Sequence, residues 1–201
     1  MELVKVTIEG TTPLLMNKFT DAAALAVSGG TSTAMVAGNK GTPREQAEKK
    51  LYTDEAGVLH IPGTNIFRAI IDAGAFHKAG RTKITTQKSS LVPAGVALLE
   101  LTCPLRGPDG DPKWEVDSRS VVIPSTGGRI MAHRPRVDAW SLSFTLDVDT
   151  TMFAVPLVRQ LVDDAGKRIG LGDFRPSRKG PFGRFVVTKW EHEKEKAKKA
   201  A

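Results

Sequence analysis

The amino-acid sequence predicts an α+β fold in which two amphipathic helices alternate with four strands of an antiparallel sheet. Two observations carry this prediction. Residues 2–9 and 140–148 alternate between apolar and polar side chains, as a half-buried strand does. Residues 64–80 and 149–168 instead repeat their apolar side chains at helical spacing, which is typical of helices that bury one face.

Between the first strand and the first of these helices we expect a flexible, protruding segment and then a short helix. Thr12 and Pro13 end the first strand, and residues 10–41 are rich in small side chains with no sustained period. Residues 42–45 (TPRE) have the spacing of a capping box with proline at the first helical position. This pattern predicts a short helix that runs to about Tyr52.

The rest of the chain completes the set of elements. Thr64 or Asn65 is expected to cap the first long helix, which ends near Gly80 with His77 and Lys78 in its last turn. Residues 92–102 predict a mostly buried strand, and the part from 114 to 136 predicts an extended hairpin or arm. Either residues 149–151 cap the second helix or Pro156 marks its start, and residues 182–190 form the last strand.

The resulting order, βαββαβ, matches the ferredoxin-like (RRM-like) arrangement with an antiparallel sheet. We expect one domain over residues 1–190, with two long insertions at about 10–60 and 104–139, and a charged tail at 191–201. In this topology the connections after the first strand, the second strand and the second helix share one end of the sheet. Residues 10–60, 104–139 and 170–183 should therefore converge.

The charge is unevenly distributed. The formal net charge is +7, and the windows 73–99, 118–137 and 174–190 contain several cations and no acid. Solvated faces usually mix both signs, so this separation favours a polyanionic partner, above all nucleic acid. The window 73–99 is expected at the opposite end of the sheet from the other two, on a path along one face.

The segment 170–185 (GLGDFRPSRKGPFGRF) is the most unusual stretch. Its four glycines permit positive φ and close backbone approach, so its amide groups can point at an anion. The alternative is that Gly170 caps the preceding helix and the rest is a mobile basic loop. The cations that would hold a phosphodiester are Arg175, Arg178, Lys179 and Arg184.

Short motifs resemble one known family. Residues 61–66 (IPGTNI) are similar to the I-P-G-S-S-L helix entry of the RAMP superfamily, whose ferredoxin-like members include the backbone subunits of CRISPR effector complexes. The first strand followed by residues 12–15 (TPLL), and the glycine-rich loop before the last strand, are two further points of similarity. The family motif usually continues with Lys-Gly, whereas here Phe67-Arg68 shifts the cation by one position.

The resemblance implies a cytoplasmic protein that coats a guide RNA as a helical row of identical subunits in an antiviral ribonucleoprotein. A protruding arm would interrupt base pairing, and a complementary target strand would hybridise alongside. Its partners would be RNA, further copies of itself and other effector subunits, with no membrane. The candidate RNA-binding residues are Thr64, Asn65, Arg68, Lys78, Arg81, Lys83, Lys88, Arg129, His133, Arg134, Arg136, Arg175, Arg178, Lys179 and Arg184.

The remaining features agree with an intracellular binding protein. The start of the chain does not resemble a signal peptide, no apolar run approaches the length of a membrane span, and the single cysteine, Cys103, fits a reducing cytosol. Phe174 or Phe182 could stack on a base or pin the loop to the core, whereas Phe185 is expected in the core.

We therefore expect a non-catalytic, sequence-independent RNA-binding subunit with no cofactor and no metal, since the patterns that mark zinc and nucleotide-hydrolysis sites are missing from the sequence. Two alternatives stay open. One is a metal-dependent ribonuclease that uses Asp21, Asp54 or the pair Asp147 and Asp149. The other is a phage protein that binds single-stranded DNA in replication or recombination.

Overall fold

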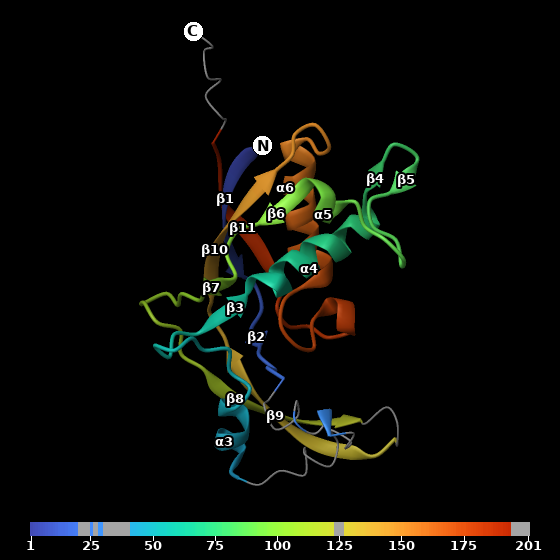
Figure 1. The fold of residues 1–201 in the computed structure, drawn as a ribbon. Helices are drawn as coiled ribbons and strands as arrows, with labels where there is room; N and C mark the ends of the chain where they lie inside the picture. Colours follow the sequence, from blue (N-terminus) through green and yellow to red (C-terminus); the bar gives the residue numbers. More distant parts are fainter. Residues whose placement is uncertain (20–24, 26–27, 30–40, 123–126, 194–201) are drawn as a thin grey trace.

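The computed structural model describes residues 1–19, 25, 28–29, 41–122 and 127–193 (Figure 1). Its strands are β1 (Glu2–Gly10), β2 (Leu14–Leu15), β3 (His60–Pro62), β4 (Lys78–Ala79), β5 (Thr82–Lys83), β6 (Val96–Leu98), β7 (Thr102–Pro104), β8 (Glu115–Val122), β9 (Arg129–Val137), β10 (Ser141–Val148) and β11 (Phe185–Glu193). Its helices are α3 (Pro43–Glu48), α4 (Gly63–Ala73), α5 (Val92–Gly95) and α6 (Val155–Asp164), with shorter helical turns η1 (Gly74–Phe76), η2 (Ala165–Ile169) and η3 (Pro176–Arg178).

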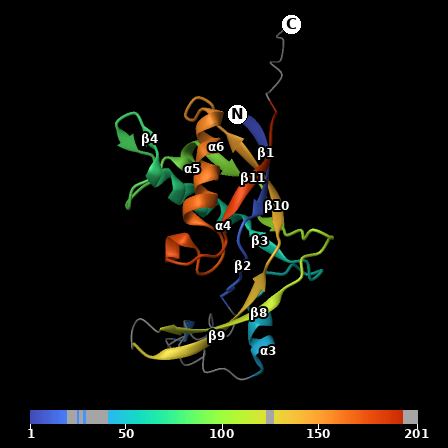
Figure 2. The same ribbon diagram turned by 180° about the vertical axis from the view of Figure 1, so that it is seen from behind.

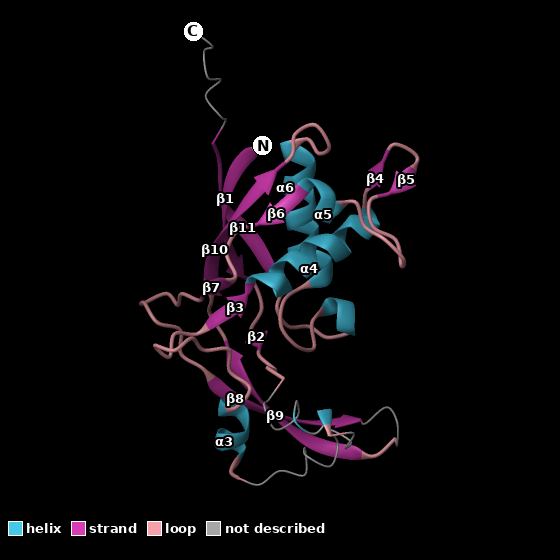
Figure 3. Ribbon diagram, viewed as in Figure 1, coloured by secondary structure: helices cyan, strands magenta, loops and turns pink. Residues whose placement is uncertain are grey.

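Within the described residues, the central sheet has four strands in the order β11-β1-β10-β6, and every neighbouring pair is antiparallel. The middle strand β1 pairs with β10 from Glu2–Val148 to Glu9–Ser141 and with β11 on its other side. Figure 3 shows α4, α5 and α6 on one side of this sheet. The predicted α+β fold with an antiparallel sheet is confirmed.

The core lies between the sheet and these helices. Alternate residues of β1 and β10 are buried, as the period-2 pattern predicts, and the apolar stripes of α4 and α6 cover them. The main contributors are Val4, Val6, Ile8, Ile66, Ile70, Leu142, Phe144, Leu146, Val148, Val158, Leu161 and Val162.

The short helix α3 has the predicted capping box. The Glu45 backbone amide donates to the Thr42 hydroxyl at 3.3 Å, and the Thr42 amide donates to the Glu45 carboxylate at 2.7 Å. These two bonds satisfy amides that have no partner inside the helix. The helix ends at Glu48, before the expected Tyr52.

Helix α4 differs from the prediction at both ends. It begins at Gly63, and neither Thr64 nor Asn65 caps it. A Cβ on Gly63 would lie 2.0 Å from the Glu100 carbonyl oxygen, so glycine lets the helix start approach the turn after β6. The helix ends at Ala73 and continues as η1, which places His77 beside Asp164 of α6 (Nε2 to Oδ2, 2.8 Å) and outside any helical turn.

The prediction of one strand over residues 92–102 is wrong. Val92–Gly95 forms the short helix α5, and β6 and β7 follow separately. Pro93 lies in the first turn of α5, where its missing amide costs nothing, whereas inside a strand it would remove a ladder hydrogen bond. The apolar pattern of this segment reflects burial, which helix and strand share.

Pro156 marks the start of the second long helix. Asp149 does not cap it: its carboxylate accepts hydrogen bonds from the Thr151 amide and hydroxyl in the turn after β10. Helix α6 ends at Asp164 and widens into the π-turn η2, with Gly166 packed against the Phe185 carbonyl. The last strand begins at Phe185, three residues later than predicted.

A second sheet, with the order β2-β9-β8 in the described residues, extends beyond the central one (Figure 2). Its hairpin of β8 and β9 runs in register from Glu115–Arg136 to Val122–Arg129, so the predicted arm is confirmed. Helix α3 packs against it, and the Arg44 guanidinium lies 3.8 Å from the centre of the Trp114 ring. No helix in the described part of the chain is long and apolar enough to span a membrane.

Candidate nucleic-acid interface

The glycine-rich loop between η2 and β11 is held in place by its backbone. The amides of Asp173 and Gly183 donate to the carbonyls of Leu15 and Pro13, each at 2.8 Å, and the Leu171 amide donates to Gly183 at 2.9 Å. The prediction that the loop amides point at an anion is therefore wrong for these three groups. The protein's own carbonyls take the place of the expected phosphate oxygens.

The glycines of this loop serve close packing. Gly183 has φ of +70°, and a Cβ there would lie 1.9 Å from the Leu171 carbonyl oxygen. A Cβ on Gly172, at φ of +72°, would lie 2.3 Å from the Leu15 carbonyl oxygen. Positive φ and the absence of a Cβ let the loop lie against the exit of β1. The loop thus packs against the chain and supports its cations, and Gly170, at φ of +76°, is the C-cap of η2, as the alternative prediction held.

Three distant segments meet at this loop, as the topology predicts. Asp173 accepts a hydrogen bond from the Asn17 amide at 3.1 Å and an ion pair from Arg134 Nε of β9 at 2.9 Å. Lys50 donates to the His133 carbonyl at 2.8 Å, and burial followed by repulsion from Arg134 lowers the pKa of this lysine. For the described residues of 10–60, 104–139 and 170–183, the convergence at one end of the sheet is confirmed.

A hollow of about 210 Å³ opens between this loop and the start of α4. Arg68 and Arg175 project into it beside the backbone of Gly170 and Gly172, and Arg175 Nη1 donates to the Gly172 carbonyl at 2.8 Å. Burial, and then the nearby charge of Arg178, lower the pKa of Arg175. Within the described residues neither Arg175 nor Arg178 forms an ion pair, although Asp173 lines the same hollow and pairs with Arg134.

A second hollow, of about 560 Å³, lies on the other side of Arg68. It is bounded by Asp72 of α4, Ile169 of η2, Ser177 of η3 and the segment from Lys83 to Gln87. Arg68 lines both hollows, so they adjoin at this side chain, and we call the two together the trough. The basic window 73–99, expected at the far end of the sheet, thus reaches the glycine-rich loop through Lys83 and Gln87.

The hairpin of β4 and β5, which projects beyond α4 in Figure 1, carries three further cations. Lys78 and Lys83 lie directly opposite each other in its register, and Arg81 occupies its turn after Gly80. Like charges in opposite positions of a hairpin destabilise it, so a bound anion would stabilise this pair of lysines. Lys88 is exposed in the neighbouring turn.

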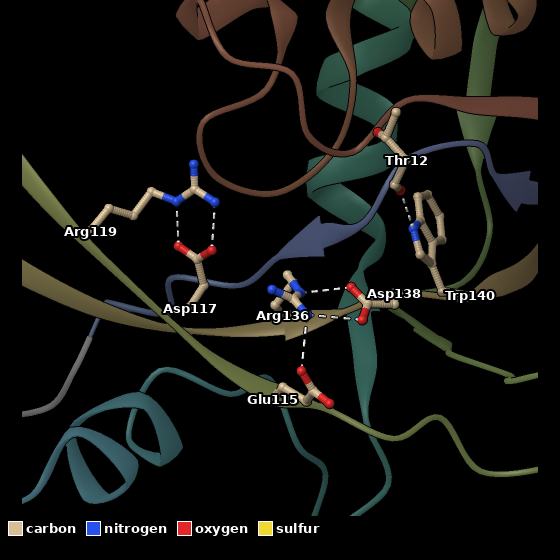
Figure 4. A network of polar contacts seen from close by, with 7 residues as sticks. All are labelled: Thr12, Glu115, Asp117, Arg119, Arg136, Asp138 and Trp140. Carbon is tan, nitrogen blue, oxygen red and sulfur yellow. Dashed lines mark hydrogen bonds and ion pairs between the residues drawn. The ribbon is translucent and has the colours of Figure 1, made fainter.

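The arginines of the long hairpin are largely neutralised, as Figure 4 shows. Arg136 donates to Asp138 and to Glu115, and the bond to Asp138 is the first cause of its raised pKa. Arg119 forms two hydrogen bonds of 2.6 Å with the buried carboxylate of Asp117. The acids lie just outside the window on the same stretch of chain, as Asp117 and Asp138 do, or on the neighbouring strand, as Glu115 does.

The other predicted residues are dispersed. Asn65 lines the first hollow, whereas Thr64 faces solvent at the helix start. Arg129 lies exposed at the beginning of β9, and His133 Nδ1 shares a hydrogen bond with the Ser118 hydroxyl at 2.7 Å. Lys179 is exposed in a left-handed conformation, and the Arg184 guanidinium donates to the Lys167 carbonyl.

The aromatic residues of the loop mostly support it. Phe182 is buried beneath the Arg119 guanidinium, 4.7 Å from the ring centre, and contacts Phe174 at 6.1 Å between ring centres. Phe185 is buried in the core, as predicted. Only Phe174 is partly exposed, and it adopts a positive φ of 47°.

Two of the acids considered for catalysis, Asp54 and Asp149, have local roles, whereas Asp147 has a buried Oδ1 with no hydrogen-bond partner in the described chain. Asp54 accepts hydrogen bonds from the amides of Ala56 and Val58, which fix a turn. Asp149 holds the turn after β10, and Asp21 lies outside the described residues. Among the described residues no group of three histidines, cysteines or acids is arranged to hold a metal ion.

The sequence did not single out four polar residues of this region: Asn17, Tyr52, Gln87 and Asp173. Asn17 and Tyr52 lie in segments whose pattern gives no sign of proximity to the loop. Gln87 lies within a basic window, where the cations are the visible pattern and a single glutamine is not marked by it. Asp173 is the one acid of the glycine-rich segment, and this isolation was the sequence feature that could have indicated its role in the site.

Of three comparisons with known proteins, the comparison with solved structures gives a match. No family model matches the chain, and no curated protein matches its sequence. A search of solved structures finds a chain from the cryo-EM structure of the Type III-B Cmr-beta bound to cognate target RNA. The TM-score is 0.51 at 12% sequence identity, over 95% of this chain and 60% of the other. The likeness is one of fold, and the chain spans less than two thirds of its structural neighbour.

Proposed function

We propose that this chain is an RNA-binding backbone subunit of a CRISPR-type effector complex, built on a ferredoxin-like core of the RAMP type. The order β11-β1-β10-β6, which is fourth-first-third-second along the chain, supports the ferredoxin-like core. The fold likeness to a chain whose structure contains target RNA supports the choice of RNA and of a multisubunit assembly.

The unbalanced arginine cluster carries the proposal. Arg68, Arg175 and Arg178 gather beside the glycine-rich loop, where Arg175 is partly withdrawn from solvent and lacks a carboxylate partner in the described chain. A phosphodiester would supply the missing negative charge, and guanidinium groups bind phosphate through paired hydrogen bonds.

The trough offers an RNA strand a path that continues beyond the arginine cluster. From the first hollow it passes Arg68 to the second hollow and the cationic hairpin of β4 and β5. Contacts to phosphates along such a path give affinity with little dependence on sequence. Further copies of the chain would continue the path along a guide RNA.

Fluorescence anisotropy with labelled RNA at several salt concentrations tests the proposal. Arg68→Ala and Arg178→Ala should each weaken RNA binding about fivefold or more at low salt, because each removes a phosphate contact. Arg106→Ala is the matched control, since its side chain is 64% exposed against 70% for Arg68 but it lies outside the trough. Equal losses in all three variants, or stronger binding to single-stranded DNA of the same sequence, would contradict an RNA-specific trough.

A further inference from the structure

The backbone turn that carries Gln87 is braced, and the exposed side-chain amide of Gln87 is unused. The turn that carries it is closed by the Thr86 amide, which donates to the Ser89 carbonyl at 2.8 Å. The Thr86 hydroxyl accepts from the amides of Lys88 and Ser89, so the turn is locally braced. Within the described chain the Gln87 side chain forms no hydrogen bond, and it lines the second hollow.

The second hollow has the size and lining of a small-molecule site. Its volume of about 560 Å³ falls in the range of ligand pockets, and Ile169 and Ala75 give it apolar walls. The other lining residues are polar or charged: Arg68, Asp72, Lys83, Thr85, Thr86, Gln87 and Ser177. The Thr85 and Thr86 hydroxyls already donate to backbone carbonyls, which leaves Gln87, the Ser177 hydroxyl and the Asp72 carboxylate as acceptors for a ligand. Asp72 uses Oδ1 to accept from Arg68 Nε at 2.9 Å, which leaves Oδ2 available as an acceptor.

Arg68 connects this hollow to the arginine cluster. The bond from its Nε to Asp72 orients the guanidinium and leaves both terminal nitrogens available. One edge of the group can therefore contact a phosphate while its plane offers a stacking surface for a base, as arginine does in RNA-binding proteins. A nucleotide whose phosphate lies at Arg68 would have its base at the second hollow.

We infer that the hollow bounded by Gln87, Asp72 and Ser177 binds one unstacked nucleobase of the strand and prefers bases that carry an exocyclic amino group. The inference rests on the proposed function. The Asp72 carboxylate and the Gln87 carbonyl are acceptors for an amino group, which cytosine, adenine and guanine present and uracil lacks. Phosphate contacts give most of the affinity, and this hollow adds a preference at one position.

Cytosine and uracil are the sharpest pair of probes, because they have the same size and differ at the amino group and the adjacent ring nitrogen. Labelled oligo(C) and oligo(U) of equal length are titrated with the protein at one salt concentration. Wild type should bind oligo(C) about fivefold more tightly, the effect of one well-placed hydrogen bond. Gln87→Met, which keeps the length and removes the amide, should abolish the preference and leave oligo(U) binding unchanged. Ser177→Ala should reduce the preference in the same way.

Gln160→Met on the outside of α6 is the matched control and should keep the preference. Equal affinity of wild type for the two oligonucleotides, or a preference that survives Gln87→Met, would overturn the base pocket while leaving the RNA-binding function intact. Failure of wild type to bind either oligonucleotide would overturn both proposals.

Discussion

Arg134 of β9 and Asp173 of the glycine-rich loop form an ion pair, with Nε 2.9 Å from Oδ2. The Arg134 side chain is only 12% exposed, and the pair joins two segments that are separated by a whole strand and helix. Through this contact the long hairpin and the loop that carries the arginine cluster behave as one unit. The position of the hairpin therefore depends on a charge that is largely withdrawn from water.

Removal of this pair should destabilise the fold. Arg134→Ala leaves the Asp173 carboxylate without its partner and should lower the free energy of unfolding by about 2 kcal/mol. The loss is smaller than for a fully buried pair because Asp173 remains 28% exposed. Urea denaturation measures it. Arg68→Ala breaks a surface pair with Asp72 and should change stability by about 0.5 kcal/mol or less, so similar losses in the two variants would refute the distinction.

Two glycines with similar backbone angles should respond differently to alanine. Gly183 and Gly80 have φ of +70° and +63°, but a Cβ on Gly183 would meet the Leu171 carbonyl oxygen at 1.9 Å, whereas nothing lies within 4 Å of one on Gly80. Gly80→Ala should cost about 1 kcal/mol, the strain of a left-handed alanine, and Gly183→Ala about 3 kcal/mol or more. Thermal unfolding of both variants checks this, and equal melting temperatures would contradict it.

The salt dependence of RNA binding should separate free from neutralised arginines. Arg178→Ala should reduce the slope of log affinity against log salt by about 1, because one phosphate contact disappears. Arg136→Ala should leave the slope unchanged, since its guanidinium already serves Asp138 and Glu115. A lower slope for Arg136→Ala would mean that those carboxylates release the arginine to RNA.

Cys103 should be unreactive in the folded protein. It is buried on β7, and burial followed by repulsion from Glu100 raises its pKa to about 12. A thiol reagent at pH 8 should modify it only after denaturation, because the thiolate is the reactive form. Fast modification of the native protein would contradict this placement.

The raised pKa of Cys103 also determines in which direction the stability of the fold changes with pH. The unfolded thiol ionises near its ordinary pKa of 9.0 while the folded thiol stays protonated, so this group's contribution to stability is complete below pH 9 and falls as the pH rises from there toward about 12. Cys103→Ala should remove that part of the alkaline decline in urea denaturation curves. An unchanged alkaline profile would assign the decline to other groups.

The sequence predicted elements whose signals are local. The alternation of β10 and the capping box of Thr42 and Glu45 both appear in the structure, because each depends on residues a few positions apart. The segment 92–102 was misassigned because a buried apolar run fits a helix or a strand, and Pro93 decided between them through the hydrogen bond it cannot donate.

The candidate site was only partly predictable, because its contacts are between distant residues. The glycines of the loop face the carbonyls of Pro13 and Leu15, more than a hundred residues earlier, which no local pattern reveals. Arg136 stands in a window without acids, yet its carboxylate partners lie one strand away and just beyond the window. Arg68 and Arg175 were identified from charge alone, but the hollow that they share required the fold.

The place of β1 in the central sheet has a consequence for how a nascent chain folds. Its neighbours β10 and β11 are among the last strands to leave the ribosome, so both hydrogen-bonding edges of β1 have no partner during most of synthesis. Pairing strands so far apart closes large loops, which slows folding and leaves an exposed strand edge meanwhile. The central sheet therefore forms only after nearly the whole chain has been made, since β1 waits for β10 and β11.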